Sequence, residues 1–407
     1  MVNNKIIQYK PISIIIINII IAISGIIVKS QHNLLPEILL PIMYGFSIFS
    51  AALIISWAAE SSEKDISGSF VIAIIALIAV LPEYAIETVL AYTAGQSYKL
   101  NNFVYTDRVG YVSANVTGAN RLLAGLGWPI IMLINMLKNN HLSNIKNDNK
   151  LELLVLGLGA ISMIIASTIK FQPIFISFIL IIIYLIYLFI TSKQESEESE
   201  FVGISEYLAN LPKPTRITTN ISLIIFSAIT IFMVSHPFVE SLIHIGGTLG
   251  IDEYYLIQWL APLASESPEI IIASLFALKG KSLESISVIL SSQANQMSLL
   301  IGSMGAIFSF ATSSIISFPL NNPQAIEFLL TAAFAFLQIS MILWGKFNLN
   351  LLGKFKLQMP IFLLIIFFIQ LIITDSSIRA YLSIAIFIFA LIYLTLFLTQ
   401  NKIKTKK

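Results

Sequence analysis

The stretch Ser67–Gly95 reads SGSFVIAIIALIAVLPEYAIETVLAYTAG, an apolar run of membrane-spanning length with the pair Pro82–Glu83 near its middle. Its pattern recurs 186 positions later within residues 251–280, where Pro268–Glu269 is the matching pair. In both copies the pair is followed, at the same spacing, by Ile, by Thr or Ser, and by Ala. Two similar membrane segments, each with a proline-glutamate pair at mid-depth, are typical of an internally duplicated transporter.

The composition is that of an integral membrane protein. Of the 407 residues, 57% are hydrophobic and 11% are charged, and the mean hydropathy is +0.86. A soluble protein of this length could not solvate so apolar a surface. The net charge of +2 gives no indication of nucleic-acid binding, because the basic residues lie in loops and tails. With no cysteine in the chain, disulfides and thiolate metal sites are excluded.

The apolar segments predict an all-α integral membrane protein with about twelve transmembrane helices. Several segments exceed the roughly 20 residues that cross a bilayer, so we expect tilts or breaks in them. The first resembles a signal peptide but lacks an Ala-x-Ala cleavage pattern, so we interpret it as a retained span. The segments are residues 11–28, 37–59, 67–95, 109–137, 151–168, 173–192, 217–246, 251–280, 285–312, 325–345, 357–374 and 377–399.

The distribution of Lys and Arg predicts the orientation in the membrane. Most of these residues fall at the two termini and in alternate loops, among them the acidic linker 193–216. The positive-inside rule then places both termini and the linker in the cytoplasm, in a multi-pass protein of the cell membrane. The third and eighth helices cross the membrane in opposite senses, so the duplication is predicted to be inverted.

These patterns predict two inverted repeats of five helices, with one extra helix at each end. The first repeat carries its motif over residues 67–137, and the second carries its motif over residues 251–312. The expected parts are an N-terminal extra helix (1–36), the first repeat (37–192), the cytoplasmic linker (193–216), the second repeat (217–374), and a C-terminal extra helix with a basic tail (375–407).

Four carboxylates lie at mid-membrane depth in the two motif segments: Glu83, Glu87, Glu266 and Glu269. The first two are four residues apart and the last two are three apart, so each pair shares one helical face. A carboxylate at mid-membrane costs several kcal/mol and usually belongs to an ion or proton path. Arg121 is the only basic residue well inside a predicted span, and one arginine cannot neutralise four glutamates. We therefore predict a cation site.

Further oxygen atoms surround these carboxylates. A proline inside a helix has no N–H to donate, so the two prolines free the carbonyls of Ile78 and Ala264. Ser265 and Ser267 add hydroxyl groups. Oxygen ligands without cysteine or a buried histidine cluster suit Ca²⁺, Na⁺ or protons better than zinc or copper.

The segments that follow the two motifs also resemble each other. Asn120 precedes Gly127 with the same spacing and the same preceding alanine as Asn295 and Gly302. Amides in a membrane either bond across helices or coordinate ions. Either role fits each asparagine taken alone, but their repetition beside the glutamate segments favours the cation site.

The chain resembles the calcium/cation antiporter superfamily, the sodium/calcium exchanger-like membrane proteins. Their two inverted repeats carry a Gly-[Ser/Thr]-Ser-x-Pro-Glu core, followed by a helix with Gly-Asn-x-x-Gly-Ser-Asn. The second core here reads ASESPE at Ala264–Glu269, and the first reads IAVLPE at Ile78–Glu83. The helix after the first core reads ANVTGAN at Ala114–Asn120.

The resemblance implies that Glu83 and Glu269 are the central cation ligands and adds Asn115 to the candidates. It implies a secondary antiporter that works by alternating access, with Ca²⁺ exchanged against Na⁺ or H⁺ as the leading expectation. Glu87 and Glu266 depart from the family pattern. Crowded carboxylates in a low-dielectric centre cannot all stay ionised cheaply, so we expect at least one to be protonated when no cation is bound, with Glu87 and Glu266 as the candidates, and an entering cation to displace protons. Arg121, if it points inward, would hold a neighbouring carboxylate ionised.

A sodium/proton exchanger is the alternative, and a cation channel is a more distant one because it too could use mid-membrane glutamates. An enzyme is not expected, since the chain has no Gly-x-Ser-x-Gly motif and no aspartate suited to intramembrane proteolysis. The expected partners are the transported inorganic cations and the lipid bilayer, with no cofactor and no nucleic acid. The oligomeric state is left open.

Overall fold

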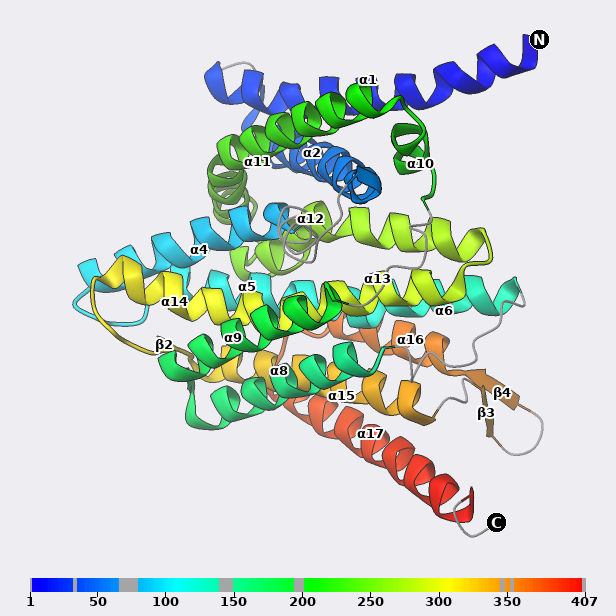
Figure 1. The fold of residues 1–407 in the computed structure, drawn as a ribbon. Helices are drawn as coiled ribbons and strands as arrows, with labels where there is room; N and C mark the ends of the chain where they lie inside the picture. The colour runs from blue at the N-terminus through cyan, green and yellow to red at the C-terminus, as the bar shows by residue number, and fades with distance from the viewer. Residues whose placement is uncertain are drawn as a thin grey trace. The chain divides into compact units, whose positions relative to one another are not determined.

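The computed structural model describes residues 2–31, 35–65, 80–138, 149–193, 201–344, 348–351 and 355–404. This part of the chain is almost entirely helical (Figure 1). Its strands form two short antiparallel pairs, β1 (Phe171–Gln172) with β2 (Phe318–Pro319), and β3 (Asn348–Leu351) with β4 (Phe355–Gln358).

Nine helices in the described part are long and apolar enough to cross a membrane. They confirm the prediction of an all-α, multi-pass membrane protein. The nine spans are Pro11–Ser30, Glu37–Asp65, Asp107–Leu137, Lys150–Ile169, Ile174–Thr191, Lys213–Leu249, Glu253–Leu278, Asn322–Trp344 and Ser376–Thr399.

The described parts of the other three predicted segments are helical but do not meet the combined length and hydropathy of a membrane span. The segment 67–95 lies partly outside the described residues, and its described part belongs to α4 (Leu81–Leu100). The segment 285–312 is divided among three consecutive helical elements and is rich in Ser and Gln. The segment 357–374 corresponds to a helix of only 14 residues, α16 (Met359–Ile372).

Contacts divide the chain into two compact units. Unit 1 comprises residues 1–90 and 185–268, and unit 2 comprises residues 91–184 and 269–407. Both units therefore draw on both halves of the sequence, so neither coincides with one predicted repeat. The helices α4, α9 and α12 contribute residues to both units.

Unit 1 is built around the packing of α2 against α11 and α1. Its apolar core takes side chains from these helices and from α10, among them Ile54, Trp57, Leu208 and Ile231. The elements are α1 (Val2–Ser30), η1 (Glu37–Leu39), α2 (Leu40–Ser62), η2 (Glu63–Asp65), α10 (Ile204–Ala209) and α11 (Lys213–Leu249), with parts of α4, α9 and α12.

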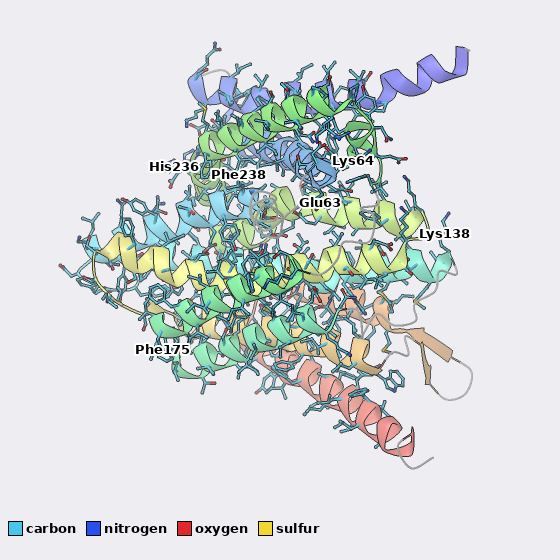
Figure 2. All side chains as sticks on the ribbon, viewed as in Figure 1. Glu63, Lys64, Lys138, Phe175, His236 and Phe238 are labelled. Carbon is cyan, nitrogen blue, oxygen red and sulfur yellow. The ribbon has the colours of Figure 1, made fainter. Side chains whose placement is uncertain are left out.

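Polar contacts tie the end of α2 to α10 and α11 within unit 1. Asp65 forms a salt bridge with Arg216 at 2.5 Å, and Arg216 also donates to the Ala209 carbonyl. Lys64, which Figure 2 labels, donates to that same carbonyl at 2.9 Å. The part of the predicted linker that follows residue 200 is thus packed against α2, whereas residues 194–200 lie outside the described part.

Unit 2 is centred on α15, which packs against α8, α17 and α5. In the most apolar stretch of α15, 78% of the residues are buried, compared with 22% in that of α17. The helix α15 is therefore a core helix, whereas α17 presents most of its apolar side chains to lipid. The elements are α5 (Asp107–Leu122), η3 (Leu123–Gly127), α6 (Trp128–Leu137), α8 (Lys150–Ile169), α9 (Ile174–Thr191), α13 (Ser282–Asn295), η4 (Gln296–Leu300), α14 (Ile301–Thr312), α15 (Asn322–Trp344), α16 and α17 (Ser376–Lys404), with parts of α4 and α12 (Glu253–Leu278).

Local sequence signals set the ends of the helices that lead to the glutamates. The helix α11 has Pro214 in its first turn, where a missing N–H costs nothing, and ends before Gly250, whose φ of +66° favours glycine. The helix α12 follows Asp252, whose carboxylate accepts the Tyr254 N–H at 2.9 Å and so caps an orphan donor of the first turn.

Candidate cation site

Two helices with different relations to their prolines carry the candidate site. In the described part α4 begins at Leu81, so Pro82 lies in its first turn, where proline is well tolerated. The carbonyl of Ile78, which we expected Pro82 to free, lies outside the described residues. The helix α12 instead continues through Pro268, which has no N–H to donate to the carbonyl of Ala264.

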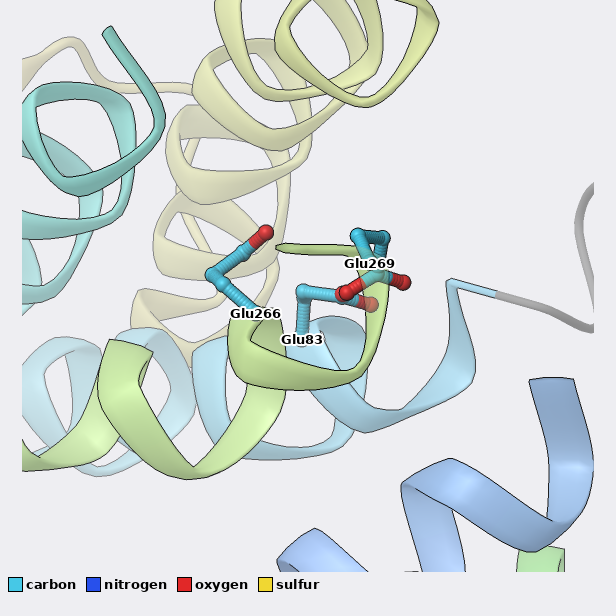
Figure 3. A group of neighbouring side chains, drawn as sticks. All are labelled: Glu83, Glu266 and Glu269. Atoms are coloured by element: carbon cyan, nitrogen blue, oxygen red, sulfur yellow. The ribbon is translucent and has the colours of Figure 1, made fainter. Parts of the chain in front are cut away.

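Three of the four predicted carboxylates meet. Glu83 of α4 and Glu266 and Glu269 of α12 each place a carboxylate oxygen within 4.8 Å of the other two (Figure 3). Glu83 and Glu266 are buried and Glu269 is half-buried. The boundary between the units falls after Pro268, but α12 is continuous there, so Glu269 is held one turn after Glu266 on the same helix.

The spacing of these oxygens suits a hard divalent cation. Calcium binds oxygen at 2.3–2.6 Å, so two ligands of one Ca²⁺ lie at most about 5.2 Å apart. A limit of 4.8 Å therefore allows all three carboxylates to contact one ion. Oε2 of Glu269 is buried and has no hydrogen-bond partner among the described residues, which leaves this oxygen for a cation or a proton.

Glu87 is not part of this group. It lies one turn beyond Glu83 on α4 and is completely buried. Ser265 and Ser267 flank Glu266, and their hydroxyls donate to carbonyls of their own helix, the Ser267 hydroxyl to Leu263 at 2.5 Å. The two serine oxygens keep lone pairs for a further contact.

The predicted asparagines all lie in unit 2 and are buried. Asn115, Asn120 and Asn295 are 4%, 2% and 1% exposed. The Asn120 amide nitrogen donates to the carbonyl of Val116 at 2.8 Å, and its Oδ1 is buried without a hydrogen-bond partner in the described part of the chain. Asn120 thus presents a fixed carbonyl oxygen, which a hard cation can use.

A feature that the sequence did not reveal follows two of these asparagines. The segments η3 and η4 are π-helical turns inserted between α5 and α6 and between α13 and α14. Asn295 directly precedes η4, and Asn120 lies three residues before the start of η3. π-Helical turns are rare in proteins, and those that occur often lie at functional sites.

Gly127, at the end of η3, lets this part of the chain approach α12. A Cβ on Gly127 would lie 3.2 Å from Cγ1 of Ile270, a tight contact. Because Ile270 follows Glu269, the π-helical turn after Asn120 packs beside the turn of α12 that carries Glu269.

Arg121 has a different role from the one expected. It pairs with Glu327 of α15 at 2.5 Å, and Arg379 of α17 contacts the same carboxylate. Arg379 lies near the start of α17, and its side chain is only 1% exposed. Sequence reasoning missed Glu327, because a lone glutamate near the start of an apolar segment resembles a solvated helix end.

The helical membrane fold and the buried carboxylates define a class of protein, the secondary cation transporters. The chain matches the sodium/calcium exchanger protein family over residues 37–193. It is similar to the crystal structure of the H⁺/Ca²⁺ exchanger CAX, with a TM-score of 0.85 and 32% identity over 96% of this chain and 96% of that one.

The Ca²⁺/H⁺ antiporter protein YfkE is a more distant match. Its TM-score is 0.56 with 16% identity, over 88% of this chain and 99% of that one, which shows a shared fold alone. No curated protein matches the chain.

The chain belongs to the sodium/calcium exchanger family. It is a cation exchanger and not an enzyme, as the motifs predicted.

Proposed function

We propose that the protein exchanges Ca²⁺ for protons across the cell membrane by alternating access. The observation that carries this proposal is the meeting of Glu83, Glu266 and Glu269 at a spacing that fits Ca²⁺. Three carboxylates buried together repel one another, so either a divalent cation or protons must compensate them. The similarity at 32% identity to an H⁺/Ca²⁺ exchanger supports protons as the counter-ion.

Within this proposal the predicted residues have different roles. The shared glutamates of the two motifs, Glu83 and Glu269, are the central ligands, and Glu266 and Glu87 carry the protons that Ca²⁺ displaces. Further oxygens would come from Asn115, Asn120, Asn295, Ser265 and Ser267.

We further propose the predicted architecture of two inverted repeats, 37–192 and 217–374, with both termini and the linker 193–216 in the cytoplasm. One correspondence supports it: a π-helical turn follows an asparagine in each repeat, η3 after Asn120 and η4 after Asn295. Repeats of this kind, with a glutamate on each, suit alternating access better than a pore.

Sodium is the second candidate for the counter-ion, because the matching family is that of sodium/calcium exchangers. Transport by the purified protein in proteoliposomes distinguishes proton exchange from sodium exchange. Vesicles are loaded at acidic pH or with Na⁺, diluted into labelled Ca²⁺, and followed for uptake. We expect uptake against the Ca²⁺ gradient only in the acid-loaded vesicles. Uptake driven by Na⁺ alone would overturn proton exchange, and Ca²⁺ flux without either gradient would indicate a channel.

A further inference from the structure

A buried charge cluster joins four helices of unit 2. Glu327 of α15 accepts hydrogen bonds from Arg121 of α5, at 2.5 Å, and from Arg379 of α17. Gln370 of α16 contacts both arginines. Its side-chain oxygen accepts from Arg121 Nη1 at 2.6 Å, and its backbone carbonyl accepts from Arg379 Nη2 at 3.1 Å. The three charged side chains are at most 5% exposed.

The two arginines of this cluster carry permanent charges. A guanidinium group does not lose its proton in a protein, and both guanidinium groups contact the carboxylate of Glu327. Removing one partner would break a buried, hydrogen-bonded charge pair, which is strongly unfavourable. The cluster therefore fixes the rotation of the helices that it joins.

Arg121 brings α5 under this constraint at the residue next to Asn120. Its Nε also donates to the Thr117 carbonyl at 3.2 Å, so the guanidinium is tied to its own helix as well as to α15. Asn120 lies about 100° around the helix axis from Arg121, and its buried Oδ1 has no hydrogen-bond partner among the described residues. The direction of that oxygen thus depends on the rotation of α5, which Arg121 holds.

From these contacts we infer that Glu327 is a positioning residue for cation binding. It holds Arg121, and through Arg121 it fixes the rotation of α5 that directs Oδ1 of Asn120. Residues that orient a metal ligand typically contribute 10- to 100-fold in metal affinity. This inference rests on the proposed function, because it takes Asn120 to be a ligand of the transported Ca²⁺.

Calcium uptake by the full chain in proteoliposomes tests the inference. The Ca²⁺ concentration is varied, so that the half-saturating concentration is measured separately from the maximal rate and from the amount of folded protein. The variants are Glu327→Gln, Asn120→Ala and their combination. The matched control is Thr331→Ala, a buried position one turn along α15, which loses a methyl group and a hydrogen bond to the Glu327 backbone carbonyl but leaves the Glu327 side chain in place.

We expect Glu327→Gln to raise the half-saturating Ca²⁺ concentration roughly tenfold or more, and Thr331→Ala to leave it unchanged. The combined variant should have a half-saturating Ca²⁺ concentration no higher than the higher of the two single-variant values, because both changes act on the same oxygen. An unchanged half-saturating concentration in Glu327→Gln, or losses that multiply in the combined variant, would overturn the inference.

Glu327→Asp keeps the charge and shortens the side chain by one methylene, so it should bind Ca²⁺ with an intermediate affinity. If Glu327→Gln does not fold, Glu327→Asp takes its place in the test. A wild-type half-saturating concentration in Glu327→Asp would also overturn the inference. A failure of the proposed function is distinguishable, because it would appear as undiminished Ca²⁺ transport in Glu83→Gln and Glu269→Gln.

Discussion

Glu83 and Glu87 lie one helical turn apart on α4, yet only Glu83 joins the three-carboxylate group. The same sequence spacing thus produces two environments. Glu83 lies beside two other carboxylates and can share a cation with them, whereas Glu87, one turn away, is fully buried outside that group. This difference favours direct cation binding by Glu83 and leaves Glu87 as the proposed proton carrier.

The first prediction concerns pH and Glu266. Protons and Ca²⁺ compete for the same oxygens, so uptake should be fastest at high pH and should fall as the pH on the side of Ca²⁺ entry decreases. Glu266→Gln removes one protonatable group and should flatten this dependence between about pH 5.5 and 8.5 while Ca²⁺ still binds, though more weakly. Initial rates of labelled Ca²⁺ uptake across that range provide the measurement.

The comparison for this prediction is Glu253→Gln, a carboxylate at the start of α12 outside the three-carboxylate group. It should keep the wild-type pH profile. If Glu266→Gln and Glu253→Gln have the same pH profile as the wild type, Glu266 takes no part in proton exchange.

At the level of single elements, close helix approaches hold the π-helical turns in place. The helix α8 contacts η4 at Gly159, where a Cβ would lie 2.2 Å from the carbonyl oxygen of Met297. That oxygen belongs to the backbone and cannot move aside cheaply. The position of the turn after Asn295 therefore depends on the absence of a side chain on α8.

We predict that Gly159→Ala destabilises the protein by about 1–3 kcal/mol, the usual cost of overpacking. Thermal unfolding of the purified protein in detergent measures the effect as a lower Tm. Gly157→Ala provides the matched control on the same helix, because a Cβ there meets nothing within 4 Å. Equal Tm values for the two variants would show that α8 and η4 do not pack as described.

The ends of a helix were predictable where the sequence marks them, whereas irregularities inside a helical segment were not. The segment 251–280 agrees with α12 to within about two residues, because its apolar run is bounded by Asp252 and Gly280. The π-helical turns left no such signal. A π-turn adds one residue without changing the apolar character of the segment, so hydropathy and spacing cannot distinguish it from a continuous α-helix.

For the whole molecule, hydropathy located most spans because the bilayer imposes a length that is visible in the sequence. The convergence of Glu83 and Glu269 was also predictable, since a repeated motif in a duplicated protein implies equivalent positions. The pairing of Glu327 with Arg121 and Arg379 was not. These residues lie on three separate helices, and only their tertiary packing shows which charges meet.

Topology gives the whole-molecule prediction. The chain has no cysteine, so a single introduced cysteine reports its own location. Leu100→Cys, at the exposed end of α4, should react with a membrane-impermeant thiol reagent in intact cells, and Glu198→Cys in the linker should react only after permeabilisation. Labelling of both positions from the same side would contradict the inverted-repeat architecture.

The central claim is that Glu83 and Glu269 hold the transported cation, and the most direct measurement is Ca²⁺ accumulation driven by a proton gradient in proteoliposomes. We expect Glu83→Gln and Glu269→Gln each to abolish accumulation, because each removes a charged ligand from the three-carboxylate group, and Glu253→Gln to retain it. Accumulation at the wild-type rate in both Glu83→Gln and Glu269→Gln would contradict the claim.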